Sequence, residues 1–98
     1  MNIQAMMKQA QKLQKDMMDE KNKIDEMEFE STNSFVKVRA NGKKEVLEIK
    51  IDKEGLDKDD VEMLQDIILV AVNDVIKQID DETEKRMGKY TQGMPGLF

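Results

Sequence analysis

The sequence predicts an α+β fold in which a long N-terminal helix, a three-stranded antiparallel meander and a long C-terminal helix follow one another in the order α-β-β-β-α. Three observations predict it. Apolar residues recur at spacings of three and four over the first 27 residues, apolar and polar residues alternate between residues 27 and 51, and an apolar segment at 67–79 lies between helix start and stop signals. A chain of 98 residues suffices for one domain, which we place at residues 1–90.

The first helix is expected from about Asn2 to Glu26. Its apolar positions form a heptad seam, a narrow stripe that suits a partner helix better than a broad globular core. The seam consists of Ile3, Met6, Ala10, Leu13, Met17, Ile24 and Met27. At about 1.5 Å per residue this helix is roughly 37 Å long, whereas a compact domain of this size has a radius of gyration of about 13 Å. The helix is therefore expected to project beyond its own core or to pack on a second subunit.

The three strands are expected at residues 27–31, 35–40 and 44–51. Thr32-Asn33 is the predicted first turn, and Asn41-Gly42 is the predicted second turn, of type I′, because these residues tolerate its two positive φ angles. With two-residue loops at both turns, the predicted cross-strand neighbours are Phe29 and Val36, Met27 and Val38, and Val36 and Leu47. One face of the sheet then carries the apolar residues Met27, Phe29, Val36, Val38, Ala40, Leu47, Ile49 and Ile51.

The second helix is expected to begin at Asp57, whose side chain can cap it, and to run for about thirty residues to Gly88. Asp57, Asp59, Asp60 and Glu62 suit the positive end of the helix dipole, an interpretation we prefer to a metal site because no calcium-loop spacing is present. The centre of the helix, residues 67–72, is apolar on all sides. One sheet and one helix cannot cover it completely, so a symmetric partner chain is expected there.

Composition argues against an enzyme. The chain has no cysteine and no histidine, which removes disulfides, thiolate metal sites and the commonest general base. No phosphate loop, nucleophile elbow or Gly-rich dinucleotide turn is present, and we expect no cofactor and no metal. The nine methionines mostly fall at seam or strand positions, where they fill space. No apolar run approaches the length of a membrane span, which favours a cytoplasmic protein with no membrane partner.

Charge is sorted along the chain, although the net charge is −5. Residues 1–15 carry Lys8, Lys12 and Lys15 and no acid. On a helix these lysines form one stripe about 10 Å long, opposite the apolar seam, which is a candidate contact for phosphates. The outer sheet face carries a second basic group, Lys37, Arg39, Lys44 and Lys50 beside Phe35. This group permits a single-strand-binding sheet, but we prefer to interpret it as an ordinary solvated face.

The chain as a whole resembles the YbaB/EbfC family of small bacterial nucleoid-associated proteins. The resemblance rests on MMKQAQKLQKDM at 6–17, VKVRANGKKEVLEIKID at 36–52, MLQDIILVAVNDVIKQ at 63–78 and the tail MGKYTQGMPGLF at 87–98. It implies a homodimer with protruding helices that binds double-stranded DNA with little sequence preference, alters the conformation of the DNA, affects gene expression and resides on the nucleoid. Transferred by position, it implies DNA contacts from Lys8, Lys12, Lys15, Lys85, Arg86 and Lys89. Lysine-rich contacts of this kind suit the phosphate backbone rather than base edges. The acids at 80–84 depart from this picture because they crowd the second basic group.

A protein-interaction module is the alternative function. Residues 91–98 are expected to form a flexible C-terminal tail in which Leu97 and Phe98 could anchor a partner. The helix seam and the sheet edges are further candidate docking surfaces for a protein partner.

Overall fold

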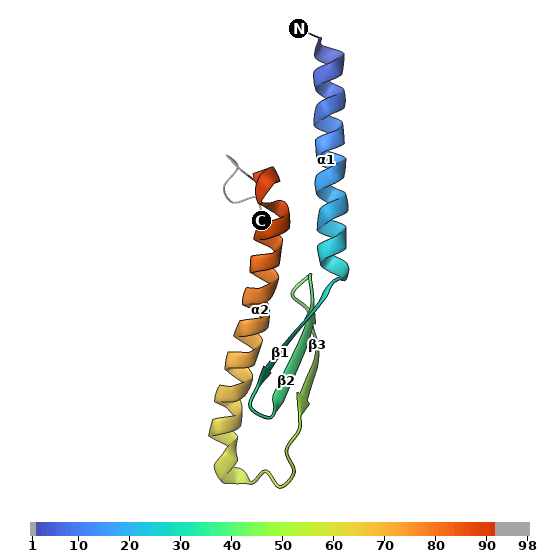
Figure 1. Cartoon of the computed structure of the whole chain (residues 1–98). Helices are drawn as coiled ribbons and strands as arrows, with labels where there is room; N and C mark the ends of the chain where they lie inside the picture. Colours follow the sequence, from blue (N-terminus) through green and yellow to red (C-terminus); the bar gives the residue numbers. More distant parts are fainter. Residues whose placement is uncertain (1, 92–98) are drawn as a thin grey trace.

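The computed structural model describes residues 2–91 and has the predicted element order (Figure 1). Helix α1 spans Ile3–Glu26, the strands β1, β2 and β3 span Glu28–Asn33, Val36–Asn41 and Val46–Ile51, a short 3-10 helix η1 spans Lys58–Asp60, and helix α2 spans Val61–Thr91. The molecule measures 71 × 22 × 14 Å, with a radius of gyration of 19.5 Å. A compact domain of this length would have about 13 Å. The chain is therefore elongated, as the long first helix predicts.

Within residues 2–91, helix α1 contacts the rest of the chain near its C-terminal end. Asn2 caps the helix by accepting hydrogen bonds from the backbone N–H groups of Gln4 and Ala5. Ile24 is completely buried, whereas Ile3 and Leu13 on the same predicted seam are 70% and 55% exposed. Figure 1 shows the N-terminal part of α1 extending past the end of α2, away from the sheet. Most of the seam thus has no partner within the described chain.

The strands form one antiparallel sheet in the order β1-β2-β3. The first turn differs from the prediction, because β1 continues to Asn33 and the chain reverses at Ser34-Phe35. Ser34 has a φ of 54°, the positive angle that a type II′ turn requires at its first central position. The predicted turn at Thr32-Asn33 was wrong because Asn33 pairs with Val36 as the last residue of the strand.

The second turn also differs from the predicted type I′ turn. The Asn41 carbonyl accepts a hydrogen bond from the Lys44 N–H, and the residue with positive φ is Lys44, at 64°, rather than Asn41 or Gly42. The Asn41 side chain accepts from the N–H groups of Lys43 and Glu45, which fixes the loop. Gly42 is needed for a different reason, because a Cβ there would lie 1.7 Å from the Ile24 carbonyl oxygen of α1. The absence of a side chain lets this loop seat the end of α1.

The predicted strand registers were wrong by four residues. Phe29 pairs with Ala40 rather than Val36, and Val36 pairs with Ile51 rather than Leu47. Because the side-chain period of a strand is two, an even displacement keeps each residue on its predicted face. A bulge next to Ala40 places Val46, not Leu47, opposite it. The prediction therefore assigned most residues to the correct face of the sheet, although all of the predicted cross-strand pairs were wrong.

The core lies between this apolar face and α2. Its buried members are Val36, Val38 and Ala40 of β2 and Ala71, Val75 and Ile79 of α2. The three α2 residues repeat every four positions and so form one helix face. The acids before the helix act as predicted, since Asp57 and Asp60 form a reciprocal capping box around η1. Helix α2 packs on β1 and β2, and all six residues of β3 remain exposed.

The predicted all-round burial of the centre of α2 is not reached within one chain, because Leu69 and Val70 are exposed. The proposed tail at 91–98 lies outside the described residues, apart from the backbone of Thr91, where α2 ends. Among residues 2–91, no helix is both long enough and apolar enough to cross a membrane.

Candidate nucleic-acid interface

The projecting part of α1 carries the first group of candidate DNA contacts. Lys8, Lys12 and Lys15 are all exposed, and none forms an ion pair within the described chain. Over seven residues their stripe rises about 10 Å, which corresponds to about three base-pair steps of a DNA strand. The first acid of the helix is Asp16. Three exposed ammonium groups are thus available to an anion on the part of α1 that lies farthest from the sheet.

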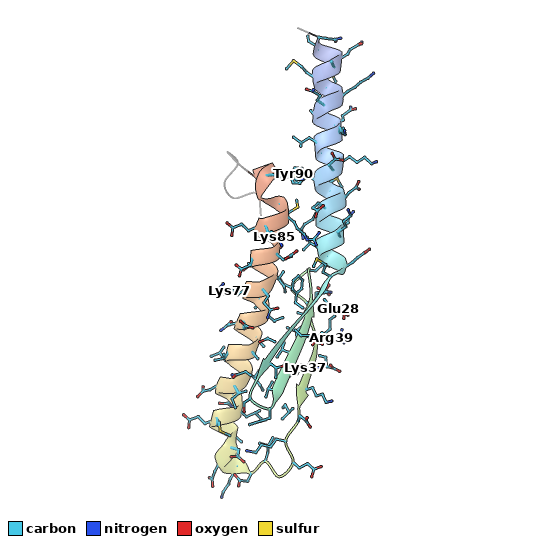
Figure 2. The ribbon with its side chains drawn as sticks, viewed as in Figure 1. Glu28, Lys37, Arg39, Lys77, Lys85 and Tyr90 are labelled. Atoms are coloured by element: carbon cyan, nitrogen blue, oxygen red, sulfur yellow. The ribbon has the colours of Figure 1, made fainter. Side chains whose placement is uncertain are left out.

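The second group lies in the last turns of α2. Lys85 and Lys89 are exposed, and the Lys89 ammonium lies 5.0 Å from the centre of the Tyr90 ring. Figure 2 shows Lys85 and Tyr90 in the part of α2 that lies farthest from η1. Neither lysine forms an ion pair with a described carboxylate. Both charges remain available.

Arg86, between them in the sequence, is engaged differently. Its guanidinium donates to Glu82, one turn earlier, at 2.5 Å and to Glu20 of α1 at 3.0 Å. These two carboxylates, with Glu82 contributing most, raise the pKa of Arg86 above its usual value. Met87 next to it is buried. Arg86 therefore links the two helices, a role that no local sequence pattern could indicate because Glu20 is 66 residues away.

The structure brings the two groups to the same end of the molecule. From the Glu20–Arg86 contact, α1 runs back toward its N-terminus and α2 runs on toward its C-terminus, and both directions lead away from the sheet (Figure 1). Along the helix axes, Lys15 lies about 7.5 Å and Lys89 about 4.5 Å beyond that contact. Because these residues are about 70 positions apart in the sequence, only the fold reveals that they lie at similar distances along the helix axes from the Glu20–Arg86 contact.

The acids that crowd this region in sequence are mostly paired with other cations. Asp80 pairs with Lys44 of the β2–β3 loop at 2.7 Å, and Asp81 pairs with Lys77 at 2.9 Å. The Asp81 carboxylate raises the pKa of Lys77. With Glu82 held by Arg86, three of the four nearby acids have partners other than Lys85 and Lys89. The local repulsion of a polyanion is weaker than the sequence suggests.

The basic group on the sheet separates into paired and unpaired members. Arg39 forms an ion pair with Glu28 at 2.7 Å, and both residues are labelled beside the sheet in Figure 2. Lys44 forms an ion pair with Asp80. Lys50 has no ion-pair partner in residues 2–91, whereas Lys37 forms an ion pair with Glu30 at 3.9 Å. Among the described residues, Lys50 is therefore the one member of the predicted cluster without an ion pair, and the Lys37–Glu30 pair is longer than the Arg39–Glu28 and Lys44–Asp80 pairs. No group of three or more potential metal-ligating side chains occurs in the described part of the chain.

The chain is similar to a known family of bacterial proteins over nearly its whole length. The model of the YbaB/EbfC DNA-binding family matches residues 1–94. The chain belongs to the YbaB/EbfC family. It is 50% identical to a nucleoid-associated protein of Oceanobacillus iheyensis, with 99% of this chain and 97% of the relative covered. A nucleoid-associated protein of Clostridium novyi is 49% identical, with 100% of this chain and 90% of the relative covered. One of Ligilactobacillus salivarius is 44% identical, with 99% of this chain and 95% of the relative covered.

Membership of the YbaB/EbfC family confirms the resemblance stated from the sequence motifs. The family is described by DNA binding and not by an enzymatic reaction. Within this YbaB/EbfC protein, the exposed cations without carboxylate partners are the side chains to consider first as DNA contacts.

Proposed function

We propose that this protein is a nucleoid-associated homodimer that binds double-stranded DNA mainly through the phosphate backbone. The observation that carries the proposal is the free lysine stripe on the part of α1 that projects beyond the sheet. Lys8, Lys12 and Lys15 are exposed and form no ion pair with a described acid. Ammonium groups of this kind attract phosphates as point charges without reading base edges. The expected binding is strong at low salt and nearly independent of DNA sequence.

Lys85 and Lys89 form the second contact in this proposal. They lie at the same end of the molecule as the α1 stripe, and the acids around them are held by other residues. Arg86 contributes less directly, because its link to Glu20 sets the relation between α1 and α2. DNA held by helices from two subunits would be bent or stiffened, and an effect on gene expression would follow from that change in DNA conformation.

The names of the three relatives support a location on the bacterial nucleoid in the cytoplasm.

The homodimer is supported by the apolar surface that one chain leaves uncovered. On β3, Ile49 and Ile51 lie on the same sheet face as the core residues of β2, yet Ile49 is 45% exposed. Leu69 and Val70 of α2 and the seam of α1 are exposed as well. Exposed apolar surfaces of this extent mark interaction sites, and an unpaired edge strand needs protection. A second copy related by twofold symmetry would bury the same surfaces on both chains.

The DNA contact is tested by replacing Lys8, Lys12 and Lys15 together with glutamine. A matched control replaces Lys23, Lys43 and Lys58, which also form no ion pair with a described carboxylate and give the same change in net charge. Affinity for a fluorescent duplex is measured at several salt concentrations. If three phosphate contacts are lost per chain, the slope of log K against log salt becomes shallower by up to about 2.7 per chain. Equal losses in both variants would show that only net charge matters and would remove the stripe from the proposal.

The dimer is tested by light scattering on the natural chain and on Ile49→Lys. The natural chain should have twice the chain mass of 11.4 kDa. Ile49 is half exposed in the single chain, so the lysine variant should keep its helical circular dichroism while its mass falls to that of one chain. A natural chain that remains a monomer would contradict the proposal.

A protein-interaction module is the second candidate function. The exposed seam residues Ile3, Met6 and Leu13 favour it, because they could receive a helix of another protein as readily as that of a second copy. A chain that is dimeric and folded but binds no duplex at low salt would favour this function over the first.

A further inference from the structure

A cavity of about 390 Å³ lies where the β1–β2 turn meets the end of β3. Its lining includes Thr32, Ser34, Phe35, Lys37, Lys50 and Asp52. Thr32, Lys37 and Lys50 form one cross-strand row, because Lys37 pairs with both of the others. Lys37 alternates with the buried Val36 and Val38, so this row lies on the sheet face opposite α2. The core residue Val36 also contributes to the lining, but the two lysines lie on the opposite face of the sheet from the apolar surface proposed for the dimer.

The charges at this cavity are arranged unfavourably for the chain alone. Lys37 and Lys50 stand directly opposite each other on neighbouring strands, and like charges in that position are destabilising. Glu30 forms an ion pair with Lys37 at the long distance of 3.9 Å, and Lys50 has no carboxylate within ion-pair distance among residues 2–91. The ammonium of Lys53 lies 4.9 Å from the centre of the Phe35 ring, which brings a third positive charge to the same corner. Asp52 is the acid in the lining, and its backbone N–H is bonded to the Phe35 carbonyl. Positive charge therefore exceeds negative charge at the cavity.

We propose that this cavity is a phosphate-binding site, with the phosphate held between the ammonium groups of Lys37 and Lys50. A phosphate monoester carries a charge of about −1.5 to −2 at neutral pH, which would offset both lysines. The hydroxyl groups of Thr32 and Ser34 are further donors in the lining. The cavity volume falls within the range of about 300 to 1,000 Å³ typical of small-molecule sites, and Phe35 supplies an apolar wall. The site therefore has room for a phosphate together with an attached nucleoside.

This site goes beyond duplex binding by α1, because it uses a different face and different residues. The phosphate can come from a free nucleotide or from a nucleic-acid strand. In both cases the ammonium groups of Lys37 and Lys50 would donate to its oxygens, although a phosphodiester within a strand carries one negative charge and would offset one of the two lysines. The probes that separate the two sources are inorganic phosphate, thymidine monophosphate and a short single-stranded oligothymidylate. Each is titrated into the full-length, isotope-labelled protein at constant ionic strength while the backbone amide signals are followed by NMR.

The proposal predicts saturable shifts confined to residues 32–37 and 50–53. The double variant Lys37→Gln/Lys50→Gln should weaken binding at least about tenfold, because two charge-assisted hydrogen bonds are removed. The control Lys43→Gln/Lys58→Gln loses the same charge elsewhere and should change the affinity less than about twofold. Saturation by the mononucleotide assigns the site to free nucleotides, and saturation by the oligonucleotide alone assigns it to a strand.

Two results would overturn the proposal. One is that none of the three probes shifts these amide signals in the natural chain. The other is that both double variants weaken binding equally, which would mean that the anion responds to net charge alone. Both pairs of lysines are exposed or partly exposed, so the amide spectrum itself reports whether each variant is folded. The variant of Lys8, Lys12 and Lys15 should keep this site, so failure here is distinguishable from failure of the duplex proposal.

Discussion

Replacing Gly42 with alanine should loosen α1 from the rest of the molecule. The new Cβ would lie 1.7 Å from the carbonyl oxygen of Ile24, whereas ordinary contact begins at 3.4 Å. The three nearest atoms all belong to the backbone of α1, so no side chain can rotate away. The helix end must therefore move, which exposes the completely buried Ile24 and stretches the 3.0 Å hydrogen bond from the Gly42 N–H to the Met27 carbonyl.

The size of the effect follows from those two losses. Burying an isoleucine side chain contributes about 1.5–3 kcal/mol, and one hydrogen bond contributes about 0.5–1.5 kcal/mol. We expect the free energy of unfolding to fall by about 2–4 kcal/mol. Urea unfolding followed by far-UV circular dichroism measures it, and the midpoint should fall by roughly 1–3 M at constant protein concentration.

Gly88→Ala is the matched control for this experiment. A Cβ at Gly88 meets no atom within 4 Å, and the residue lies inside α2. Alanine there should raise the free energy of unfolding by about 0.5–1 kcal/mol through helix propensity. If Gly42→Ala were instead within about 0.5 kcal/mol of the natural chain, the seating of α1 on the β2–β3 loop would be wrong.

Three further perturbations test the core, the α2–sheet contact and the helix–helix link. Ile79→Ala should lower the free energy of unfolding by about 2–5 kcal/mol and Ile79→Val by only about 0.5–1.5, because the site is completely buried; equal effects in urea would contradict that. The side chains of Ser31 and Gln78 lower the pKa of Asp74 below its ordinary 3.8, so its charged form favours the folded state. Asp74→Asn should therefore destabilise the chain at neutral pH, and the difference should disappear as the pH falls through the lowered pKa; a difference that persists at acid pH would refute this. Combining Glu20→Gln with Arg86→Gln should destabilise the chain no more than Arg86→Gln alone, since both remove the same link, whereas additive thermal destabilisation would mean that the link is not formed in solution.

Much of the fold could be predicted because its signals are local. The spacing of Ile3, Leu13 and Ile24 indicated one helix, and Asp57 marked the start of the next. The second turn was wrongly predicted because Asn41-Gly42 is a strong short hairpin signal, yet Gly42 serves a close approach to α1 and Lys44 takes the positive φ. That close approach is a tertiary contact, which no local pattern specifies.

In the candidate site, too, the features set by local sequence were predictable and those set by tertiary contacts were not. Exposure of Lys8, Lys12 and Lys15 was predictable because they lie opposite the apolar seam. The pairing of Arg86 with Glu20 was not predictable, because it depends on how two helices far apart in sequence meet. Likewise, the opposition of Lys37 and Lys50 depends on the strand register, which the misplaced turns concealed.

The most direct test of the central claim is the affinity of the natural chain for two duplexes of equal length and unrelated sequence, measured from about 50 to 200 mM salt. Backbone binding predicts nearly equal affinities for the two duplexes and a linear fall of log K with log salt, with a slope of about −0.9 for each phosphate neutralised. An affinity that is independent of salt, or a strong preference for one sequence that persists across the range, would contradict binding through the phosphate backbone.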